Sequence, residues 1–357
     1  MKKNAKTLST EKAQSLFQRG KAAWNEWTAQ HQDWSVDFRG VEFENADFSN
    51  FKFPGKTIFA ACRFKGRTNF KEAHFNGHAL FNRAWFEGKA EFDRAVFRKK
   101  AEFLGVSFVG DTLFKGAEFN EEAFFQTSEF EKVVYFSRAK FSCRSHAANF
   151  HGCIFHRTFA LACYFARVPD LVSTHIPLGV DISQIKIDEH SVGHFYKKYE
   201  DRSESARYRR LKDLALEAKD IESEQKFFGY ELRAKRGYKT TGWKLVPNLL
   251  YDWFGDFGRS ISRPTFILIA VWLIWAVFYW LSANSQLPGN FFTALVFSAS
   301  QIVPFFGFAN KAGAEAIKAL YCNHPDNWVF VLAFVENLFG FSLIFLVGVA
   351  LRNRFKI

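Results

Sequence analysis

Phenylalanine recurs along the first half of the chain at a regular spacing. From Phe53 to Phe141 the interval between successive Phe residues alternates between six and five without a miss. A small or short residue lies two positions before most of these Phe residues. The repeating unit is therefore Ala-x-Phe followed by a turn. The small residues are Ala46, Ala73, Ala79, Ala84, Ala90, Ala95, Ala101, Val106, Thr112, Ala117, Ala123, Ser128, Val134 and Ala139.

This unit predicts a β-solenoid. In a short strand the side chains alternate, so the small residue and the Phe share the inward face while the middle residue faces solvent. On a helix, spacings of five and six would place successive Phe about 140° and 120° apart and make no stripe. Four short sides instead make a coil of about 22 residues, and the coils stack at roughly 4.8 Å through parallel strand pairing, Phe upon Phe.

The run "KAEFDRAVFRKKAEFLGVSFVGDTLFKGAEF", residues 89–119, resembles the pentapeptide-repeat family in its Phe-rich form. The resemblance covers about residues 38–165 and implies a right-handed quadrilateral β-helix. It predicts a shape and no particular function, because one fold carries many functions. Residues 1–37 are expected to cap the solenoid, with one amphipathic helix over residues 10–30 that covers the first coil.

The repeat weakens toward its C-terminal end. After Phe141 the register slips and the pattern fades by Val168, so we expect the solenoid to occupy residues 38–168. Three Cys and three His crowd near this end, which could suggest zinc, but Cys153 and Cys163 occupy the small-residue position and packing explains them better. Five Cys without C-x-x-C spacing make no disulfide framework and are expected to be reduced.

Residues 169–260 are predicted to form a helical connector and an interfacial segment. Over residues 201–236 apolar residues recur every three or four positions, and Asp220 can cap a second helix, which predicts a helical hairpin. Residues 245–258 mix Leu, Tyr, Trp and Phe with Asp, a composition typical of a segment at a membrane interface.

Residues 261–357 are predicted to form a membrane domain. Two apolar runs, at about 264–283 and 328–351, are long enough to span a bilayer. The basic residues that flank them are Arg259, Arg263, Arg352, Arg354 and Lys356. By the positive-inside rule both ends lie in the cytoplasm, and no apolar signal segment follows the N-terminus. We therefore expect a multi-pass protein of a bacterial-type inner (plasma) membrane with cytoplasmic N- and C-termini.

The segment between the two runs holds a third apolar stretch at about 290–308. Polar residues and Pro304 interrupt it, so it predicts a re-entrant loop rather than a third span, which would move the C-terminus to the other side. Glu336 lies near the middle of the second run, where an ionised carboxylate costs a few kcal/mol. Either Glu336 is functional, or it is protonated or bonded to Asn337 or to a neighbouring chain.

The membrane domain resembles the two-helix pore-loop module of tetrameric cation channels. It has the same order of a span, a re-entrant loop and a second span, which contains Glu336 and Gly340. The resemblance implies a homo-oligomer, a tetramer, with Gly340 as the hinge of the inner helix. The sequence "IVPFFGF", residues 302–308, replaces the family's Thr-Val-Gly-Tyr-Gly filter, so a carbonyl-cage potassium filter is not expected. The pore and selectivity candidates are Ser298, Ser300, Gln301, Pro304, Phe305, Phe306, Gly307 and Glu336.

Composition and charge narrow the function classes. A formal charge of +12 suits an anionic membrane surface or nucleic acid, and the apolar runs favour the membrane. The sequence contains no phosphate-binding loop, zinc-protease motif or nucleophile elbow, so we expect no enzyme, no cofactor and no metal. DNA mimicry needs an acidic surface, which a basic chain lacks. The expected partners are membrane lipid, further copies of the chain and permeant ions, without nucleic acid.

Two functions remain. The first is an oligomeric, channel-like membrane protein that conducts cations, with a cytoplasmic solenoid for assembly or sensing. The alternative is a membrane-tethered β-helix that serves as a scaffold for protein–protein interaction and has no conductance.

Overall fold

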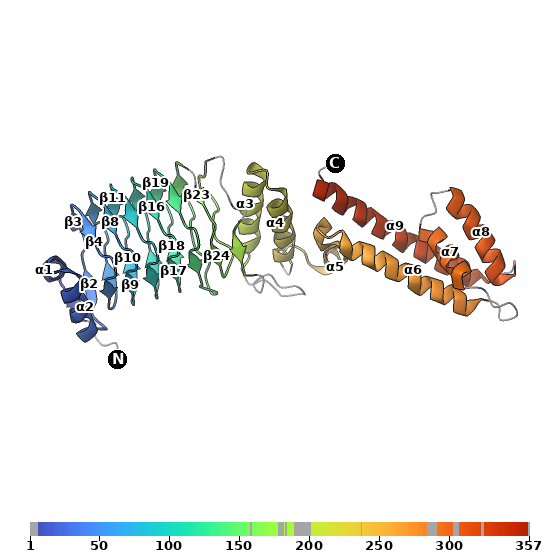
Figure 1. Cartoon of the computed structure of the whole chain (residues 1–357), viewed down its shortest axis with the longest axis horizontal. Coiled ribbons are helices and arrows are strands. Elements are labelled where there is room, and N and C mark those ends of the chain that lie inside the picture. Colours follow the sequence, from blue (N-terminus) through green and yellow to red (C-terminus); the bar gives the residue numbers. More distant parts are fainter. Residues whose placement is uncertain are drawn as a thin grey trace. The chain divides into compact units, whose positions relative to one another are not determined.

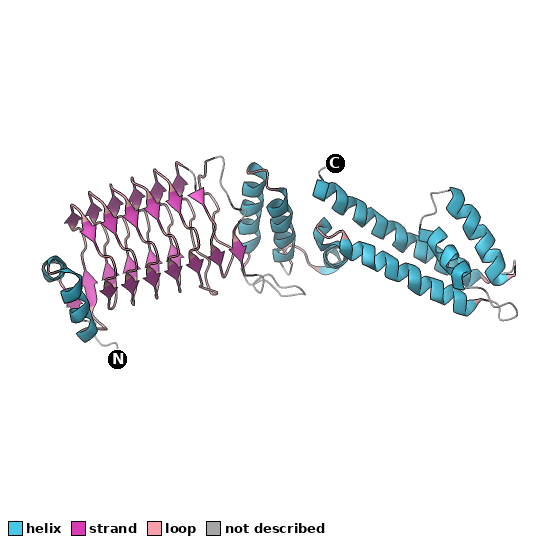
Figure 2. Ribbon diagram, viewed as in Figure 1, coloured by secondary structure: helices cyan, strands magenta, loops and turns pink. Residues whose placement is uncertain are grey.

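The computed structural model contains two compact units, Met1–Lys239 and Thr240–Ile357 (Figure 1). The first is a β-solenoid with helices at both ends, and the second is helical (Figure 2). The structure describes residues 6–157, 159–177, 182, 184–188, 201–236, 238–283, 291–302, 307–322 and 325–355.

The solenoid has four faces, each a parallel sheet of very short strands, here called faces A to D. Face A holds β1 (Thr7–Leu8), β2 (Ser35–Asp37), β6 (Thr57–Ile58), β10 (Ala79–Leu80), β14 (Ala101–Glu102) and β18 (Ala123–Phe124). Face B holds β3 (Glu42–Phe43), β7 (Arg63–Phe64), β11 (Trp85–Phe86), β15 (Ser107–Phe108), β19 (Glu129–Phe130) and β22 (Ile154–Phe155).

The other two faces alternate with these around the coil. Face C holds β4 (Ala46–Asp47), β8 (Thr68–Asn69), β12 (Ala90–Glu91), β16 (Thr112–Leu113), β20 (Val134–Tyr135) and β23 (Phe159–Ala160). Face D holds β5 (Lys52–Phe53), β9 (His74–Phe75), β13 (Val96–Phe97), β17 (Glu118–Phe119), β21 (Lys140–Phe141), β24 (Tyr164–Phe165) and β25 (Lys186–Ile187). The predicted four-sided β-helix is confirmed.

The core of the solenoid is a set of stacked phenylalanine columns. Phe97 pairs in register with Phe75 and Phe119 on face D, and its ring lies 4.8 Å from each of theirs, tilted by 4° and 3°. The small residues two positions earlier, such as Ala95, are buried as well. Each fully buried Phe contributes on the order of 1.5–3 kcal/mol through the hydrophobic effect, so the columns hold the coils together.

The alternation of five and six residues reflects two kinds of corner. The five-residue corners after faces A and C contain a residue with positive φ, for example Ala61 (55°) and Arg94 (57°). The six-residue corners hold an extra residue, often glycine. At Gly88 a side chain would collide with the backbone of Gly66 in the previous coil, so glycine allows the coils to approach there.

The N-terminal cap differs from the single helix expected over residues 10–30. Two helices, α1 (Thr10–Gln18) and α2 (Gly20–Gln30), meet at Gly20, whose φ of 84° is incompatible with a continuous helix. The prediction was wrong because the apolar positions alone do not reveal this break. The cap still covers the first coil, since the indole of Trp24 is buried and donates to the Lys52 carbonyl oxygen at 2.9 Å.

At its other end the solenoid extends beyond residue 168. Strand β25 pairs with β24, and Leu171, Ile182 and Ile185 take over the core where Phe is absent. The predicted hairpin of α3 (Glu204–Glu217) and α4 (Ile221–Ala234) follows, with the Asp220 carboxylate accepting from the Ser223 amide at 3.1 Å. Tyr208 and Leu211 of α3 belong to the solenoid core, so the hairpin closes this end.

The second unit consists of five helices and two short 3₁₀ turns in the described residues. They are η2 (Gly242–Lys244), α5 (Leu245–Gly255), η3 (Asp256–Gly258), α6 (Ser262–Ser282), α7 (Phe291–Ile302), α8 (Gly307–Tyr321) and α9 (Asn327–Phe355). Helices α6 and α9 coincide with the two predicted spans and are long and apolar enough to cross a membrane. The third apolar stretch contains helix α7, and the sequence did not anticipate helix α8 after it.

Candidate functional site

Glu336 lies at the centre of a buried polar cluster in the second unit. Its side chain is fully enclosed on α9. One carboxyl oxygen accepts from the Tyr279 hydroxyl of α6 at 2.9 Å, and the other contacts the Ser298 hydroxyl of α7. The cluster therefore joins three helices of one chain, and Asn337 does not take part in the hydrogen bonds that the structure describes for Glu336.

The Ser298 hydroxyl also contacts a backbone oxygen of α6. Ser298 has one hydroxyl proton but two acceptors in reach, the Glu336 carboxyl group and the Trp272 carbonyl oxygen at 3.0 Å. Either the Ser298 proton is shared between these two oxygens, or a neutral Glu336 carboxyl group donates the second proton. A neutral carboxyl group also avoids the cost of a buried charge without a cationic partner.

The other polar candidates on α7 also turn inward. The Ser300 hydroxyl is buried and donates to the Phe297 carbonyl oxygen at 2.6 Å, and the Gln301 amide donates to the Ser300 hydroxyl at 3.0 Å. Gly313 of α8 packs directly on Ser300, where any side chain would collide. These groups thus help to pack α7 against α8.

The glycine candidates have different surroundings. Gly340 is buried where α9 crosses α7, and a Cβ atom there would lie 3.1 Å from the Cα atom of Ile302. Gly340 thus allows close approach of the two helices, and its role as a hinge stays a prediction. Gly307 begins α8. The remaining pore candidates, Pro304, Phe305 and Phe306, lie outside the described residues.

Further hydrogen bonds between helices surround the cluster. The Trp272 indole of α6 donates to the Leu295 carbonyl oxygen at 3.0 Å, and the Trp275 indole donates to that of Leu332 at 3.3 Å. Sequence reasoning missed Tyr279 and both tryptophans, because an apolar run gives no sign of which aromatic side chains turn inward. Hydrogen bonds between helices are thus found in the interior of the unit, beside its apolar core.

The outward surface of α6 and α9 is apolar. Phe266 on α6 and Phe334 on α9 are each 71% exposed. Other large apolar side chains that are exposed on these helices are Ile269, Leu273, Ile274, Val277, Phe278, Leu281, Phe330, Val331, Leu338, Phe339, Phe341, Ile344 and Phe345. Single exposed apolar residues are ordinary, but a continuous surface of this size marks contact with lipid or with another protein.

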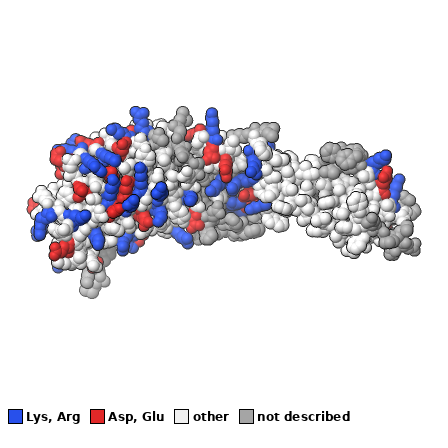
Figure 3. Space-filling model, viewed as in Figure 1, with Lys and Arg blue, Asp and Glu red and all other residues white. Residues whose placement is uncertain are grey.

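The two ends of the α6–α9 pair differ in charge. At one end the Asn353 side chain of α9 donates to the Gly258 carbonyl oxygen at 3.3 Å, so the arginines that flank the two helices gather there. At the other end the hydroxyls of Ser282 and Tyr321 lie 2.7 Å apart. The visible face of this unit is largely uncharged (Figure 3). The flanking arginines thus mark one end of the hairpin, while α8 near the other end carries Lys311, Glu315 and Lys318.

The solenoid surface carries interleaved charges of both signs (Figure 3). On face C, Glu91 is 1% exposed and pairs with Arg67, Lys71 and Lys89 at 2.5–3.0 Å. Burial alone would raise the pKa of Glu91, but hydrogen bonds from these three cations outweigh it and lower the pKa to about 2. Face C can therefore hold a carboxylate tightly among basic side chains.

The cysteines near the end of the repeat are part of the core. The Cys153 thiol donates to the Phe125 carbonyl oxygen at 2.8 Å, and burial raises its pKa to about 12. Cys163 is buried too, whereas the His156 side chain is exposed and lies 2.7 Å from Glu129. Packing accounts for both Cys positions, as predicted, and the described residues contain no group of three or more side chains placed to hold a metal.

Comparison with known proteins supports the repeat. Residues 59–99 and 92–140 match the family model described as pentapeptide repeats (nine copies). The pentapeptide repeats inferred from the Phe spacing are thereby confirmed within the solenoid. No curated protein and no solved structure matches the chain.

Proposed function

We propose that this chain is a membrane-anchored scaffold for protein–protein interaction. The α6–α9 hairpin anchors it in a bilayer and the solenoid presents its faces to partners. The observation that carries the proposal is the distribution of side chains in the second unit, where Tyr279 and Ser298 each bond to Glu336 inside while Phe266 and Phe334 are exposed. Such an apolar surface favours contact with lipid. Polar groups at membrane depth find no water, so they must form hydrogen bonds within the protein.

The length and charge of the hairpin agree with this proposal. Helix α6 has 21 residues and is about 32 Å long, close to the roughly 30 Å of a bilayer core. By the positive-inside rule, the arginines gathered at one end support a cytoplasmic location for that end. Both ends of the chain are then cytoplasmic, and the membrane is proposed to be a bacterial-type inner membrane.

A third feature supports the anchor. Trp243, Val246, Leu250 and Trp253 form an exposed apolar stripe along η2 and α5, with the tryptophans 77% and 60% exposed. Their spacing of three, four and three residues places them on one side of a helix. Tryptophan prefers the level of the lipid headgroups, so α5 is proposed to lie in the interface just before α6 enters the membrane.

The solenoid suits the scaffold role because its core and its surface are separate. The inward residues hold the fold, so the outward residues can take any chemistry that a partner requires. Trp85 and Ile154 on face B are apolar and exposed, which is typical of positions that contact another protein.

The oligomeric cation channel is the less favoured function. A pore shared by several chains would need Ser298 and Glu336 to face a neighbouring copy, yet both are enclosed within a single chain. Purified protein in liposomes separates the two functions. The scaffold function predicts no cation flux. Cation flux with a reversal potential that changes in Glu336→Gln would refute the scaffold function and support the channel.

The anchor is tested by extraction of membranes from cells that produce the full chain. We expect the protein to stay in the pellet in alkaline carbonate and in high salt, and to dissolve in detergent. The double variant Phe334→Arg/Leu338→Arg is expected to lose most of its membrane fraction, because each arginine at mid-span costs about 2.5–3.5 kcal/mol. Trp85→Arg, which changes an exposed apolar residue of the solenoid, serves as the control. Release of the wild-type chain by carbonate would refute the anchor.

A further inference from the structure

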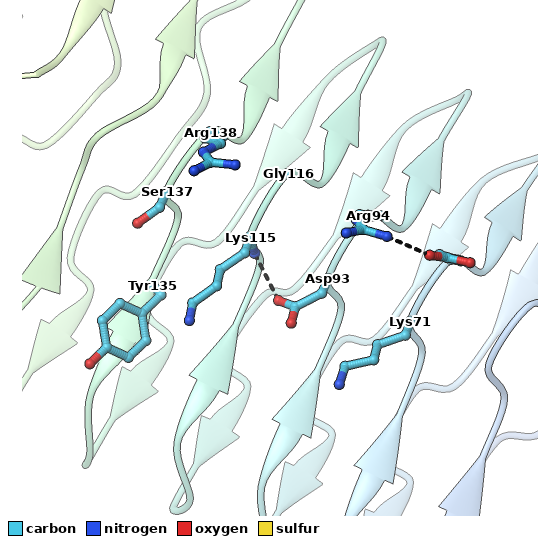
Figure 4. Close-up of a pocket in the computed structure, with 9 residues that line it drawn as sticks. Lys71, Asp93, Arg94, Lys115, Gly116, Tyr135, Ser137 and Arg138 are labelled. Carbon is cyan, nitrogen blue, oxygen red and sulfur yellow. Dashed lines mark hydrogen bonds and ion pairs between the residues drawn. The ribbon is translucent and has the colours of Figure 1, made fainter.

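A hollow of about 660 Å³ lies on the solenoid where face C turns toward face D, here called the face C hollow. Four successive coils contribute to its wall (Figure 4). The lining residues are Lys71, Glu72, Asp93, Arg94, Lys115, Gly116, Tyr135, Ser137 and Arg138. Cations outnumber carboxylates in this wall by four to two.

Gly116 opens the centre of the hollow. The left-handed corner position is occupied in successive coils by Glu72, Arg94, Gly116 and Arg138. A Cβ atom on Gly116 would meet only the Arg94 side chain, at 3.7 Å, so the missing side chain leaves a gap between two arginines. Figure 4 shows Arg94 and Arg138 on either side of Gly116, with Lys71, Lys115 and Tyr135 directed to the same side of the coils.

The outward position of the face C strands carries a carboxylate only in the earlier coils. The outward position of successive strands is Asp47, Asn69, Glu91, Leu113 and Tyr135. Glu91 engages the cations of its own neighbourhood, but the next two coils offer Leu and Tyr at the corresponding position. In the coils of Lys115 and Arg138 this strand position therefore holds no carboxylate.

Two cations of the hollow have no carboxylate partner among the residues that the structure describes. Within the described residues Lys115 and Arg138 form no ion pair, and the Lys115 ammonium group lies instead 4.7 Å from the centre of the Tyr135 ring. Arg94, in contrast, pairs with Glu72 at 2.9 Å. Lys115 and Arg138 are exposed and available to an anionic ligand.

We propose that the face C hollow binds an acidic polypeptide segment of a partner protein, with carboxylates seated on Lys115 and Arg138. The proposal rests on the scaffold function and names the chemistry of the partner. Lys115 and Arg138 lie in successive coils, which stack at roughly 4.8 Å, so their long side chains can reach carboxylates at positions i and i+2 of an extended peptide, about 7 Å apart on one face. Glu72 and Asp93 in the wall oppose a continuous phosphate backbone but can accept from peptide N–H groups.

The experiment measures peptide binding to the purified full chain in a non-ionic detergent. The probe is a fluorescein-labelled twelve-residue peptide of alternating Glu and Gly, and the matched probe carries Gln in place of Glu. We expect saturable binding of the Glu peptide that weakens with added salt, and no binding of the Gln peptide. Equal binding of both peptides would overturn the proposal.

The variant Arg138→Glu locates the site. We expect the dissociation constant of the Glu peptide to rise about tenfold, since a favourable charge becomes a repulsive one. Arg83→Glu is the matched control, because Arg83 is an exposed arginine at the left-handed corner after face A, with φ 59° against 60° at Arg138. Glutamate is tolerated in this conformation, as Glu72 shows. The control should change binding less than twofold, and equal loss in both variants would refute the site.

Two further outcomes decide between ligands and between proposals. If an oligothymidylate of the same charge binds more tightly than the Glu peptide and also depends on Arg138, the hollow recognises nucleic acid and the proposal is wrong. If the Glu peptide does not bind while the full chain resists carbonate extraction, the acidic partner is refuted and the membrane anchor stands.

Discussion

At the scale of single residues, the solenoid assigns a separate task to each position of its repeat. Phe and the small residue before it fill the core, and the residue between them meets solvent. Phe97 is fully buried between the rings of Phe75 and Phe119, whereas Val96 beside it is partly exposed. The stability of the fold should therefore depend on the first kind of position far more than on the second.

The variant Phe97→Ala tests this assignment. Removal of a buried ring is expected to lower the free energy of unfolding by about 3–5 kcal/mol, through lost burial and a cavity. Phe97→Asp should collapse the solenoid, because it buries a charge. Circular dichroism of the full chain during heating measures the effect, with Val96→Ala as the neighbouring control. Melting of Phe97→Ala at the temperature of that control would show that the strand register is wrong.

The residues of the solenoid core were predictable because the contacts that matter repeat along the sequence. The polar cluster was not. Tyr279 and Ser298 lie 57 and 38 residues from Glu336, and their contacts depend on how each helix is rotated about its axis. An unusual carboxyl group in an apolar run could be found from sequence, but its partners could not.

At the scale of elements, the second unit is held together by polar contacts among α6, α7 and α9. Bonds of this kind fix the rotation and depth of helices that have little apolar driving force to associate in lipid. Gly340 contributes by letting α9 approach Ile302 of α7. The Glu336 carboxyl group is thus expected to act as a clamp between helices.

The clamp makes a specific prediction for two substitutions. Glu336→Gln should retain the fold, because the amide donates to Ser298 and its carbonyl oxygen accepts from Tyr279. Glu336→Leu leaves both hydroxyls without this partner and should destabilise the unit by about 1–3 kcal/mol. Thermal unfolding in detergent, followed by tryptophan fluorescence, measures both variants, with Asn337→Leu as a control for loss of a polar side chain. Equal stability of the Gln and Leu variants would rule out the clamp.

Helices and strands were predictable where the sequence has a regular spacing of apolar residues or an uninterrupted apolar run. The repeat strands, the α3–α4 hairpin and the two long helices follow from such patterns. Helix α8 does not, because its Ala-rich sequence lacks the long apolar run of a span and it packs on α7 through small residues such as Gly313. The break at Gly20 was not predicted either. Glycine can occur within a helix, and the sequence does not show that this glycine adopts a positive φ.

At the scale of the whole molecule, the chain combines two units with opposite relations to solvent. The solenoid buries its aromatic core and exposes charge, while the α6–α9 hairpin encloses the Glu336 cluster and exposes apolar side chains. Each unit also contains one cysteine that lies outside its core. Cys143 lies in the solenoid and Cys322 follows α8 at the end of the hairpin away from the arginines, and each is partly exposed. The other three cysteines are buried.

Labelling of these two cysteines tests the membrane-anchored scaffold most directly. In sealed bacterial spheroplasts that produce the full chain, a membrane-impermeant maleimide should label Cys322 and spare Cys143, and permeabilisation should expose both. Cys322→Ser should remove the external signal, whereas Cys143→Ser should leave it unchanged. Labelling of Cys143 from outside, or of both cysteines only after permeabilisation, would contradict a solenoid held at the cytoplasmic side by a hairpin that crosses the membrane.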